Sequence, residues 1–295
     1  MAEFNFCTIS TKSHLFKCAA LANSLSSFKG HLHVLIVDSS DPIELVVPNL
    51  SIYYLDDIDS KLGSQIIKKY HSKLDELRWS LKPVLLSKLL SQFDEVIYVD
   101  NDIHFFNDFS FLFDDLKQHS ILLTPHDYPR SPKEDQNWFE ANFRVGLFNA
   151  GFIGVNKNAI NVLNWWGEAC LYRCEKNYWR GLFDDQKYLD LIPIMEESCK
   201  IIHHKGCNVA AWNKGLRKCD YINQVHVVND STPLVFYHFN QFSLNELDPK
   251  DQVLIDYLKS LSQFEYAESY FPKANKTSNI DKLKLGIWKL LNKLN

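Results

Sequence analysis

Two aspartates, Asp100 and Asp102, directly follow an apolar segment, residues 95–99, that has the pattern of a buried strand. Side chains two residues apart in extended backbone project to the same side. Two carboxylates held this close repel each other unless a cation lies between them, and Mg²⁺ or Mn²⁺ accepts one or two carboxylates together with substrate phosphates. The pattern therefore predicts a metal site for a nucleoside diphosphate. The alternative is a solvated turn at the end of a strand.

A second Asp-x-Asp pattern, Asp57-Ile58-Asp59, follows the apolar run 52–55, so spacing alone does not choose between the two. Asp56 and Asp57 have a sufficient structural role as the N-cap and first-turn acids of a helix over 57–70. Asp100 has no helix to cap directly. We therefore assign the metal site to Asp100 and Asp102.

The elements that must position these carboxylates alternate between strand and helix patterns. This alternation predicts an α/β fold with a mostly parallel central sheet flanked by helices, whose ligands bind at the carboxyl ends of the strands. Pro83 is expected in the first turn of its helix, where its ring is tolerated, and 125–138 is expected to be a long loop near the site. The predicted strands are 4–9, 31–37, 52–55, 96–99, 147–155, 225–228 and 234–237, and the predicted helices are 13–28, 57–70, 83–92, 159–174 and 184–191.

Composition describes an ordinary folded protein: 295 residues, of which 46% are hydrophobic and 23% charged. The longest apolar runs are strand-sized, so no membrane span is expected, and no secretory signal is visible at the N-terminus. Seven cysteines without a Cys-x-x-Cys pair fit reduced thiols. We expect a cytoplasmic protein.

Charge is distributed unevenly along the chain. The net charge is −4, but segment 273–295 carries six lysines and one aspartate (+5), which leaves −9 on the preceding body. Nucleic acid is therefore an unsuitable partner for that body. Segment 279–295 has the pattern of a basic amphipathic helix, which predicts contact with the anionic inner leaflet of a membrane; the alternative is a helix docked on its own body or on a dimer partner.

Four segments in a fixed order resemble nucleotide-sugar-dependent glycosyltransferases of the GT-A fold, closest to family 8 and its bacterial surface-polysaccharide and lipopolysaccharide relatives. They are FCTIS, LKPVLLSKLLSQFDEVIYVDND, LFNAGFIGVN and FDDQKYLD, spread over residues 4–240. The resemblance implies a nucleotide-sugar-binding half (1–125), an acceptor-side half with a closing loop (126–245) and C-terminal helices (246–295).

The resemblance also implies a ligand set for Mn²⁺ or Mg²⁺: Asp100, Asp102 and His238, with Asp100 also near the ribose or sugar. His238 follows a late strand, and the alternative for it is a buried histidine hydrogen-bonded at a strand end. The family's downstream His-x-x-Gly-x-x-Lys-Pro-Trp segment is absent, and YHFNQF stands in its place. A zinc site from Cys199, His203, Cys207 and Cys219 is a rival with irregular spacing.

Donor-binding roles follow by resemblance for the nucleoside, the diphosphate and the sugar. The alternatives are a strand-to-helix junction for 8–10, a surface lysine for Lys82 and an ordinary buried strand for 149–151; His126 either lines the cleft or satisfies a turn. The segment 203–213, with Trp212, resembles a loop that closes over the diphosphate. The implied donor-binding residues are Thr8, Ile9, Ser10, Lys82, Asp100, Asn101, Asn149, Ala150, Gly151, His204, Gly206 and Asn208.

Catalytic roles fall by resemblance on Asp184, Asp185 and Gln186. Asp185 would hold the donor hexose hydroxyls and Gln186 would lie near the anomeric carbon, whereas helix capping accounts for only one of the two acids. A front-face, retaining attack needs no strong protein base, and an inverting one would use Asp184 or Asp185.

The resemblance therefore implies transfer of a hexose from a UDP-sugar to a hydroxyl of an oligosaccharide or lipid-linked glycan, with retention. A nucleotidyltransferase or sugar-nucleotide hydrolase is disfavoured because no Gly-rich phosphate loop follows the first strand. A catalytically silent glycan-binding protein is the third alternative.

Overall fold

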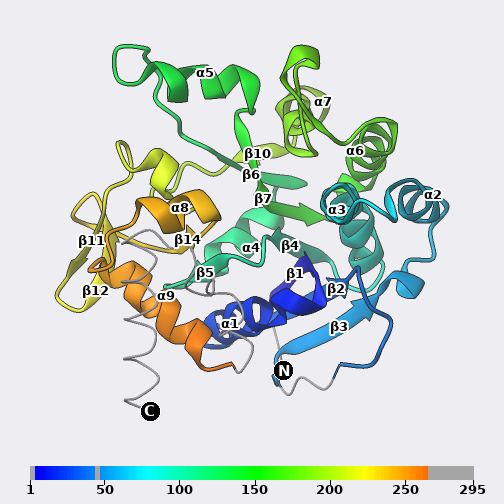
Figure 1. The fold of residues 1–295 in the computed structure, drawn as a ribbon, viewed down its shortest axis with the longest axis horizontal. Helices are drawn as coiled ribbons and strands as arrows, with labels where there is room; N and C mark the ends of the chain where they lie inside the picture. The colour runs from blue at the N-terminus through cyan, green and yellow to red at the C-terminus, as the bar shows by residue number, and fades with distance from the viewer. Residues whose placement is uncertain (1–3, 44–46, 265–295) are drawn as a thin grey trace, which may run out of the picture.

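The computed structural model describes residues 4–43 and 47–264, and its centre is a seven-stranded sheet with strand order β10-β6-β7-β4-β1-β2-β3 (Figure 1). β1 pairs in parallel with β2 and β4, β2 with β3, and β10 with β6, whereas β7 runs antiparallel to both its neighbours. The predicted mostly parallel sheet is confirmed. Its strands are β1 (Phe4–Ser10), β2 (Gly30–Ile36), β3 (Leu50–Tyr54), β4 (Glu95–Val99), β6 (Ile121–Pro125), β7 (Phe148–Asn156) and β10 (Cys199–Ile201).

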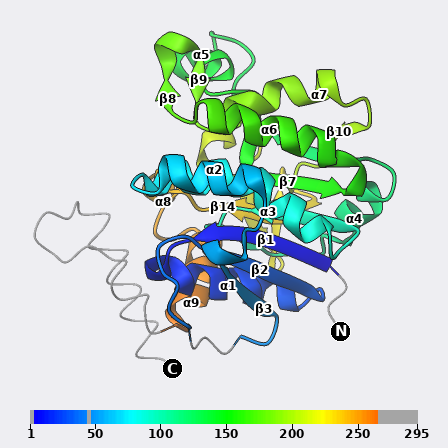
Figure 2. The same ribbon diagram turned by 90° about the vertical axis from the view of Figure 1, so that its right-hand side faces the viewer.

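Helices cover both faces of the sheet (Figure 2). The cluster on one face joins α2, α3 and α6 to inward residues such as Val96 and Tyr98, and the cluster on the other joins α1 and α4 to Ile97 and Val99. Successive side chains of β4 thus enter different cores, as strand geometry requires. The helices are α1 (Leu15–Ser26), α2 (Lys61–Tyr70), α3 (Leu74–Leu90), α4 (Ser110–Leu116), α5 (Gln136–Arg144), α6 (Ile160–Tyr172), α7 (Ile192–Met195), α8 (Gln241–Glu246) and α9 (Gln252–Ser262).

Smaller elements complete the side of the molecule that carries the site. β14 (Phe236–His238) pairs antiparallel with β5 (Ile103–Phe105), so the late strand predicted at 234–237 begins two residues later. β11 (Cys219–Ile222), β12 (Val225–Val228) and β13 (Thr232–Pro233) form a three-stranded sheet, and β8 (Lys176–Asn177) pairs with β9 (Leu182–Phe183). The 3₁₀ turns are η1 (Lys12–His14), η2 (Leu55–Asp57), η3 (Lys157–Ala159), η4 (Tyr178–Arg180), η5 (Gln186–Leu191) and η6 (Ala211–Asn213).

Pro83 corrects one expectation, because it lies inside α3 and not in its first turn. A proline here cannot donate the helical hydrogen bond to the carbonyl four residues earlier. The helix continues across it because a fully buried leucine recurs every fourth residue, at Leu77, Leu81, Leu85 and Leu89, and packs on the sheet. Burial of this stripe outweighs the local cost of the proline.

The acids near residue 57 correct a second expectation. Ser60, and not an aspartate, is the N-cap of α2, where its side chain accepts the N–H of Gly63. Asp57 closes the preceding turn η2 by accepting the N–H of Tyr54 at 2.7 Å. The helix predicted at 184–191 is also different in the structure: it is the 3₁₀ helix η5, which begins at Gln186 and is followed by the single turn α7.

Several sequence expectations concern the chain as a whole. All seven cysteines are free thiols. Among the described residues, no helix is long and apolar enough to span a bilayer. The central sheet contains strands from both expected halves, 1–125 and 126–245. β7, from the second half, lies between β6 and β4, which come from the first. The predicted membrane-contact helix at 279–295 lies outside the described residues.

Candidate metal and donor site

The two aspartates of the motif stand where β4 ends, and β5 begins at the next residue, Ile103. In the β5–β14 ladder Ile103 pairs with His238, and the N–H of Phe239 donates to the carbonyl of Asp102 at 2.8 Å. This register brings the imidazole beside the carboxylates from a position 136 residues further along the chain.

The three side chains form a compact group. His238 Nε2 lies 3.0 Å from Asp102 Oδ1 and 3.9 Å from Asp100 Oδ2. One ligand atom from each residue lies within 4.8 Å of the other two, and this is the metal-ligand group found in residues 4–43 and 47–264. The rival set of Cys199, His203, Cys207 and Cys219 does not assemble there.

The residues present fit a divalent cation. Asp102 Oδ1 is buried and makes no hydrogen bond of good geometry within the described structure, although His238 Nε2 lies 3.0 Å away. A buried carboxylate oxygen without a donor is costly unless a charge compensates it. Two carboxylates and one imidazole are a donor set that divalent metals accept.

Charge inside the group is mutually stabilising. Burial alone would raise the pKa of Asp102, but His238 outweighs it and lowers that pKa. Burial alone would lower the pKa of His238, but Asp102 outweighs it and raises that pKa. The site therefore favours a cation between its carboxylates.

β7 supports the metal group from behind. Asn149 Nδ2 donates to His238 Nδ1 at 3.0 Å and to Asn208 Oδ1 at 2.7 Å, while its Oδ1 accepts the N–H of Gly151 at 2.9 Å. A Cβ on Gly151 would lie 2.6 Å from His238 Cε1 and 2.9 Å from Asp100 Oδ2. Only glycine lets the ligands approach the strand this closely.

Aromatic packing holds the imidazole from the other side. The centroid of the Trp212 ring lies 5.2 Å from that of His238, in an edge-on arrangement. Trp212 Nε1 and Asn213 Nδ2 both donate to the carbonyl of His126. His126 is buried, and its Nδ1 lies 3.0 Å from the Gly146 carbonyl oxygen, so it joins the supporting structure.

Lys82 is enclosed, which excludes the surface-lysine alternative. Its side chain is 4% exposed, and its Nζ lies 3.1 Å from Asp185 Oδ2 and 3.5 Å from Asp100 Oδ1. The ammonium also donates to the carbonyl of Ala150 at 3.0 Å. Asp185 Oδ2 is buried and makes no hydrogen bond of good geometry within the described residues, so Lys82 is its close charged neighbour.

This cation links the metal group to the acids that precede η5. Burial would lower the pKa of Lys82, but Asp100 and then Asp185 raise it, so the ammonium stays charged. Burial raises the pKa of Asp185 to about 8 despite Lys82. Tyr98, a residue that sequence reasoning missed, donates from its hydroxyl to Asp100 Oδ1 at 2.9 Å.

The other two residues assigned catalytic roles have structural partners. Asp184 Oδ1 accepts the N–H of Gln186 at 3.0 Å, whereas Asp185, the N-cap residue of η5, makes no side-chain capping bond. Gln186 Oε1 accepts the N–H of Ala150 at 3.2 Å, and its Nε2 donates to the Val145 carbonyl at 3.3 Å. The side chains of Asp184, Asp185 and Gln186 are all buried.

A cavity of about 180 Å³ lies beside Lys82 and the two aspartates of the metal group, Asp100 and Asp102. Ile9 lines it. The adjacent Ser10, whose Oγ accepts from Asn101 Nδ2 at 3.0 Å, is fully buried, and so is Thr8. Arg78 and Trp79 are lining residues that sequence reasoning missed, although they precede Lys82 by four and three positions on α3 and so share its face. The lining residues are Ile9, Arg78, Trp79, Lys82, Tyr98, Asp100, Asn101 and Asp102.

The expected closing loop divides into two parts. Asn208 is fully buried and contacts Asn149, so it belongs to the site's support. The His204 ring packs against Phe111 with the two ring planes tilted, and its Nδ1 accepts the N–H of Gly206. A Cβ on Gly206 would lie 2.0 Å from the Pro233 carbonyl oxygen, so this glycine serves packing.

Two curated proteins of Bacillus subtilis (strain 168) resemble the chain. YfnF, described as an uncharacterized protein, is 28% identical over 255 residues, which cover 82% of this chain and 84% of YfnF. YfnD, described in the same way, is 29% identical over 256 residues, which cover 83% and 79%. No family model matches the chain.

Solved structures share the fold at low sequence identity. The apo structure of WbbM, a bifunctional glycosyltransferase, has a TM-score of 0.53 at 12% identity and matches 92% of this chain. The apo form of the glycosyltransferase GlyE from Streptococcus pneumoniae TIGR4 has a TM-score of 0.52 at 14% identity and matches 91%. The chain spans 51% of the WbbM chain and 63% of the GlyE chain. The fold and the site together define an α/β protein with a candidate divalent-metal centre at the carboxyl edge of its sheet.

Proposed function

We propose that this protein is a metal-dependent glycosyltransferase of the GT-A fold, similar to family 8, that moves a hexose from a UDP-sugar to a hydroxyl of a bacterial surface glycan. The observation that carries the proposal is the Asp100–Asp102–His238 group, with Lys82 and Asp185 beside it. The fold shared with WbbM and GlyE supports the same class of reaction.

The ligands of a Mn²⁺ or Mg²⁺ ion would be Asp100, Asp102 and His238. Such an ion neutralises charge that develops on the departing diphosphate. Lys82 would add a fixed, buried positive charge next to Asp100, at the carboxylate oxygen that does not face His238. A charge that is already desolvated needs no reorganisation during the reaction, so it favours the leaving group.

The sugar would lie over the start of β7. Gly151 lets His238 and Asp100 approach the backbone of β7, and Asp185 has a buried oxygen without a hydrogen-bond partner that could accept a sugar hydroxyl. Asp185 is held by Lys82, and its backbone carbonyl accepts Trp166 Nε1 at 3.0 Å, so its position is fixed. Ile9, Ser10 and Asn101 would contact the nucleoside from the end of β1 and β4.

We propose retention of the anomeric configuration. Asp184 is engaged by the N–H of Gln186 and lies 3.7 Å from Lys176, and Asp185 lies against Lys82. Neither carboxylate lines the cavity beside the metal group, which disfavours an inverting mechanism, because that mechanism needs a base within reach of the acceptor hydroxyl. The proton coupling constant of the new anomeric centre reads the outcome directly, and a product with the opposite configuration to the donor would refute retention.

Turnover tests the proposal. Purified protein is incubated with UDP-glucose, UDP-galactose or UDP-N-acetylglucosamine and Mn²⁺, and UDP release is measured with a glycan acceptor or with water. Loss of a group that only supports a metal ligand typically lowers metal affinity or activity about 10–100-fold. Asp102→Asn should lower turnover at least that much.

The chain supplies a matched control. Asp59→Asn changes an exposed aspartate of the other Asp-x-Asp pattern and should leave turnover unchanged. Equal loss in both variants, or no release of UDP from any donor by the folded wild type, would count against a UDP-sugar transferase.

A further inference from the structure

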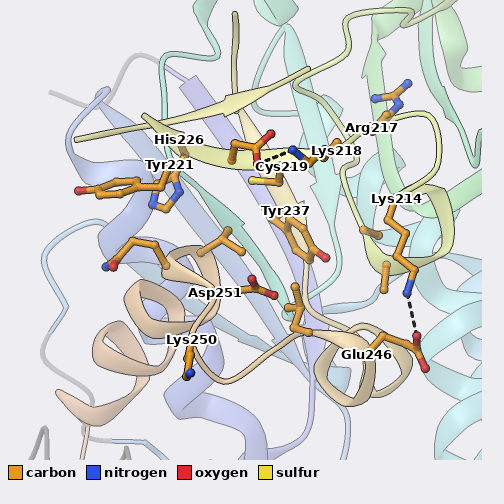
Figure 3. A pocket seen from close by; sticks show the side chains of 16 residues that line it. Lys214, Arg217, Lys218, Cys219, Tyr221, His226, Tyr237, Glu246, Lys250 and Asp251 are labelled. Atoms are coloured by element: carbon orange, nitrogen blue, oxygen red, sulfur yellow. Dashed lines mark hydrogen bonds and ion pairs between the residues drawn. The ribbon is translucent and has the colours of Figure 1, made fainter. Parts of the chain in front are cut away.

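A second cavity lies away from the metal group. It measures about 470 Å³ and is enclosed by η6, the β11–β12 hairpin, β14 and the start of α9 (Figure 3). This volume is in the range of about 300–1,000 Å³ that is typical of small-molecule sites. The side chains that matter below are Lys214, Lys218, Tyr237, Glu246, Lys250 and Asp251.

The second cavity and the metal group stand back to back. Tyr237 and His238 are consecutive in β14, so their side chains point to opposite sides of the strand. Ala211 likewise lines the cavity, while the next residue, Trp212, packs on His238. One wall therefore separates two sites with different contents.

Tyr237 gives the second cavity an unused hydrogen-bonding group. The residue is 3% exposed, and within the described part of the chain its hydroxyl has no hydrogen-bond partner although it borders the cavity. Figure 3 shows this hydroxyl directed into the open space. Burial, followed by the neighbouring Cys219 and Asp251, raises the pKa of Tyr237, so the hydroxyl is a neutral donor.

Asp251 contributes an acceptor at the same cavity. Its Oδ2 accepts the N–H of Asp248 at 2.8 Å, and no hydrogen bond within residues 4–43 and 47–264 uses its Oδ1. Asp251 is the N-cap residue of α9, yet its side chain makes no capping bond. The Tyr237 hydroxyl, a donor, and Asp251 Oδ1, an acceptor, thus belong to residues that line the same cavity.

The charges of this cavity balance, which disfavours a charged ligand. Lys214 pairs with Glu246 at 3.0 Å, and Lys218 pairs with Asp220 at 2.9 Å. Lys250 and Asp251 are of opposite sign. The Arg217 guanidinium is turned away, onto Asp127 and the carbonyls of residues 204, 205 and 207. An anion would meet three carboxylates here, and a cation would meet three lysines.

We propose that this cavity is a non-catalytic carbohydrate site that binds one neutral sugar unit of the glycan acceptor, remote from its reacting end. Sugar hydroxyls both donate and accept, so they match the Tyr237 hydroxyl, the free Asp251 oxygen and the lysines at the rim. The exposed ring of Tyr221 at the hairpin provides an apolar surface for the C–H face of a sugar. The identity of the occupant as acceptor rests on the proposed function.

The test measures sugar binding with the metal site disabled. Saturation-transfer NMR is recorded on Asp100→Asn protein in EDTA with glucose, galactose, mannose, N-acetylglucosamine, rhamnose, lactose and maltose. At least one of them should bind. Adding Tyr237→Phe or Asp251→Asn should weaken its binding about tenfold, because each removes or neutralises one partner of a hydrogen bond.

Folding does not confound these variants. The Tyr237 hydroxyl has no partner to lose, and the amide oxygen of an asparagine at position 251 can still accept the N–H of Asp248. Asp114→Asn, which changes an exposed ion pair on α4, is the control and should bind sugar like the parent. If no saccharide binds, or if binding survives both cavity variants unchanged, the carbohydrate site is refuted.

Failure of the transferase proposal would be visible separately. Sugar binding that depends on Tyr237 and Asp251, in a protein that releases no UDP from any donor, upholds the cavity as a carbohydrate site and removes its role as an acceptor subsite. UDP release without sugar binding upholds the transferase and refutes the cavity.

Discussion

Lys82 is the residue on which the interior of the site depends. Its side chain and that of Asp185 are 4% and 2% exposed, so solvent does not screen their interaction, and without Lys82 the Asp185 carboxyl would be buried either uncompensated or fully protonated. Removing one partner of a buried pair leaves the other uncompensated, which costs far more than the pair contributes. The Ala150 carbonyl would also lose its donor.

We predict that Lys82→Met lowers the free energy of unfolding by about 3 kcal/mol. Adding Asp185→Asn removes the stranded carboxyl and should restore at least about 1 kcal/mol. Urea unfolding of the two single variants and the double variant measures this coupling. Effects that add within about 0.5 kcal/mol would show that the two side chains are not coupled.

Gly151 offers a test of the metal group that does not touch a ligand. In Gly151→Ala the new methyl would push His238 and Asp100 apart, so Mn²⁺ affinity measured by calorimetry should fall about 10–100-fold.

Gly154→Ala is the matched control for this change, since it lies on the same strand and its methyl would meet Leu122 at 3.1 Å. It should alter stability and leave Mn²⁺ affinity unchanged. Unaltered Mn²⁺ affinity in Gly151→Ala would contradict the assignment of the three ligands.

At the scale of elements, the site depends on a short antiparallel pairing. β5 follows the motif directly and fixes β14 by three register pairs, which places His238 beside Asp102. The other edge of β14 is held by Gly206 and the residues that follow it. The Gly206 carbonyl accepts the N–H groups of Val235 and Phe236. Gly206 itself fits against the backbone of β13 with no room for a side chain.

We predict that Gly206→Ala lowers the free energy of unfolding by about 1–3 kcal/mol, because its methyl would collide with a backbone oxygen that has no alternative rotamer. A Cβ at Gly215 meets nothing within 4 Å, so Gly215→Ala should change it by less than about 0.5 kcal/mol. Thermal or urea unfolding compares them, and equal stability of the two variants would argue against this tight contact.

The elements next to the motif could be predicted from sequence because their patterns are local. Strands β1, β2, β4 and β7 and helix α6 follow from runs of buried residues, and Asp100 and Asp102 follow from their place at a strand end. The path of α3 could not be predicted, because Pro83 gives a strong local stop signal that distant packing on the sheet overrides. His238 was placed by resemblance, since no local pattern reveals a pairing between β5 and β14.

The supporting contacts were also beyond local reasoning. Tyr98, Arg78 and Trp79 line the first cavity because of where the folded chain carries them. The resemblance implies a donor-binding role for Asn149, and in the structure its amide also contacts His238 and Asn208. Such roles depend on side-chain positions that a single sequence does not specify.

For the molecule as a whole, buried histidines set the response to acid. Burial lowers the pKa of His104 to about 4. The unfolded chain takes up this proton near pH 6.5 and the folded chain does not, so the stability from this group is present above 6.5 and is lost as pH falls towards 4. At pH 5 the loss is about 2 kcal/mol.

We predict that His104→Phe reduces the fall in unfolding free energy between pH 7 and pH 5 by about 2 kcal/mol. The raised pKa of Asp185 has the opposite effect, since it makes stability rise as pH falls. Asp185 is present in both the wild type and His104→Phe, so its contribution cancels in the comparison. Urea unfolding at the two pH values measures the difference, with His203→Gln at an exposed position as the control. An unchanged pH dependence in His104→Phe would contradict the account of this residue.

The most direct test of the central claim is a thermal-shift panel of UDP, GDP, CMP and dTDP, each with and without Mn²⁺, on the wild type, Asp102→Asn and Asp59→Asn. A ligand that binds only the folded state raises the melting temperature. A metal-dependent nucleotide-sugar site predicts a rise of several degrees with UDP only when Mn²⁺ is present, abolished in Asp102→Asn and retained in Asp59→Asn. No rise with any nucleotide in the wild type, or an equal rise in Asp102→Asn, would contradict it.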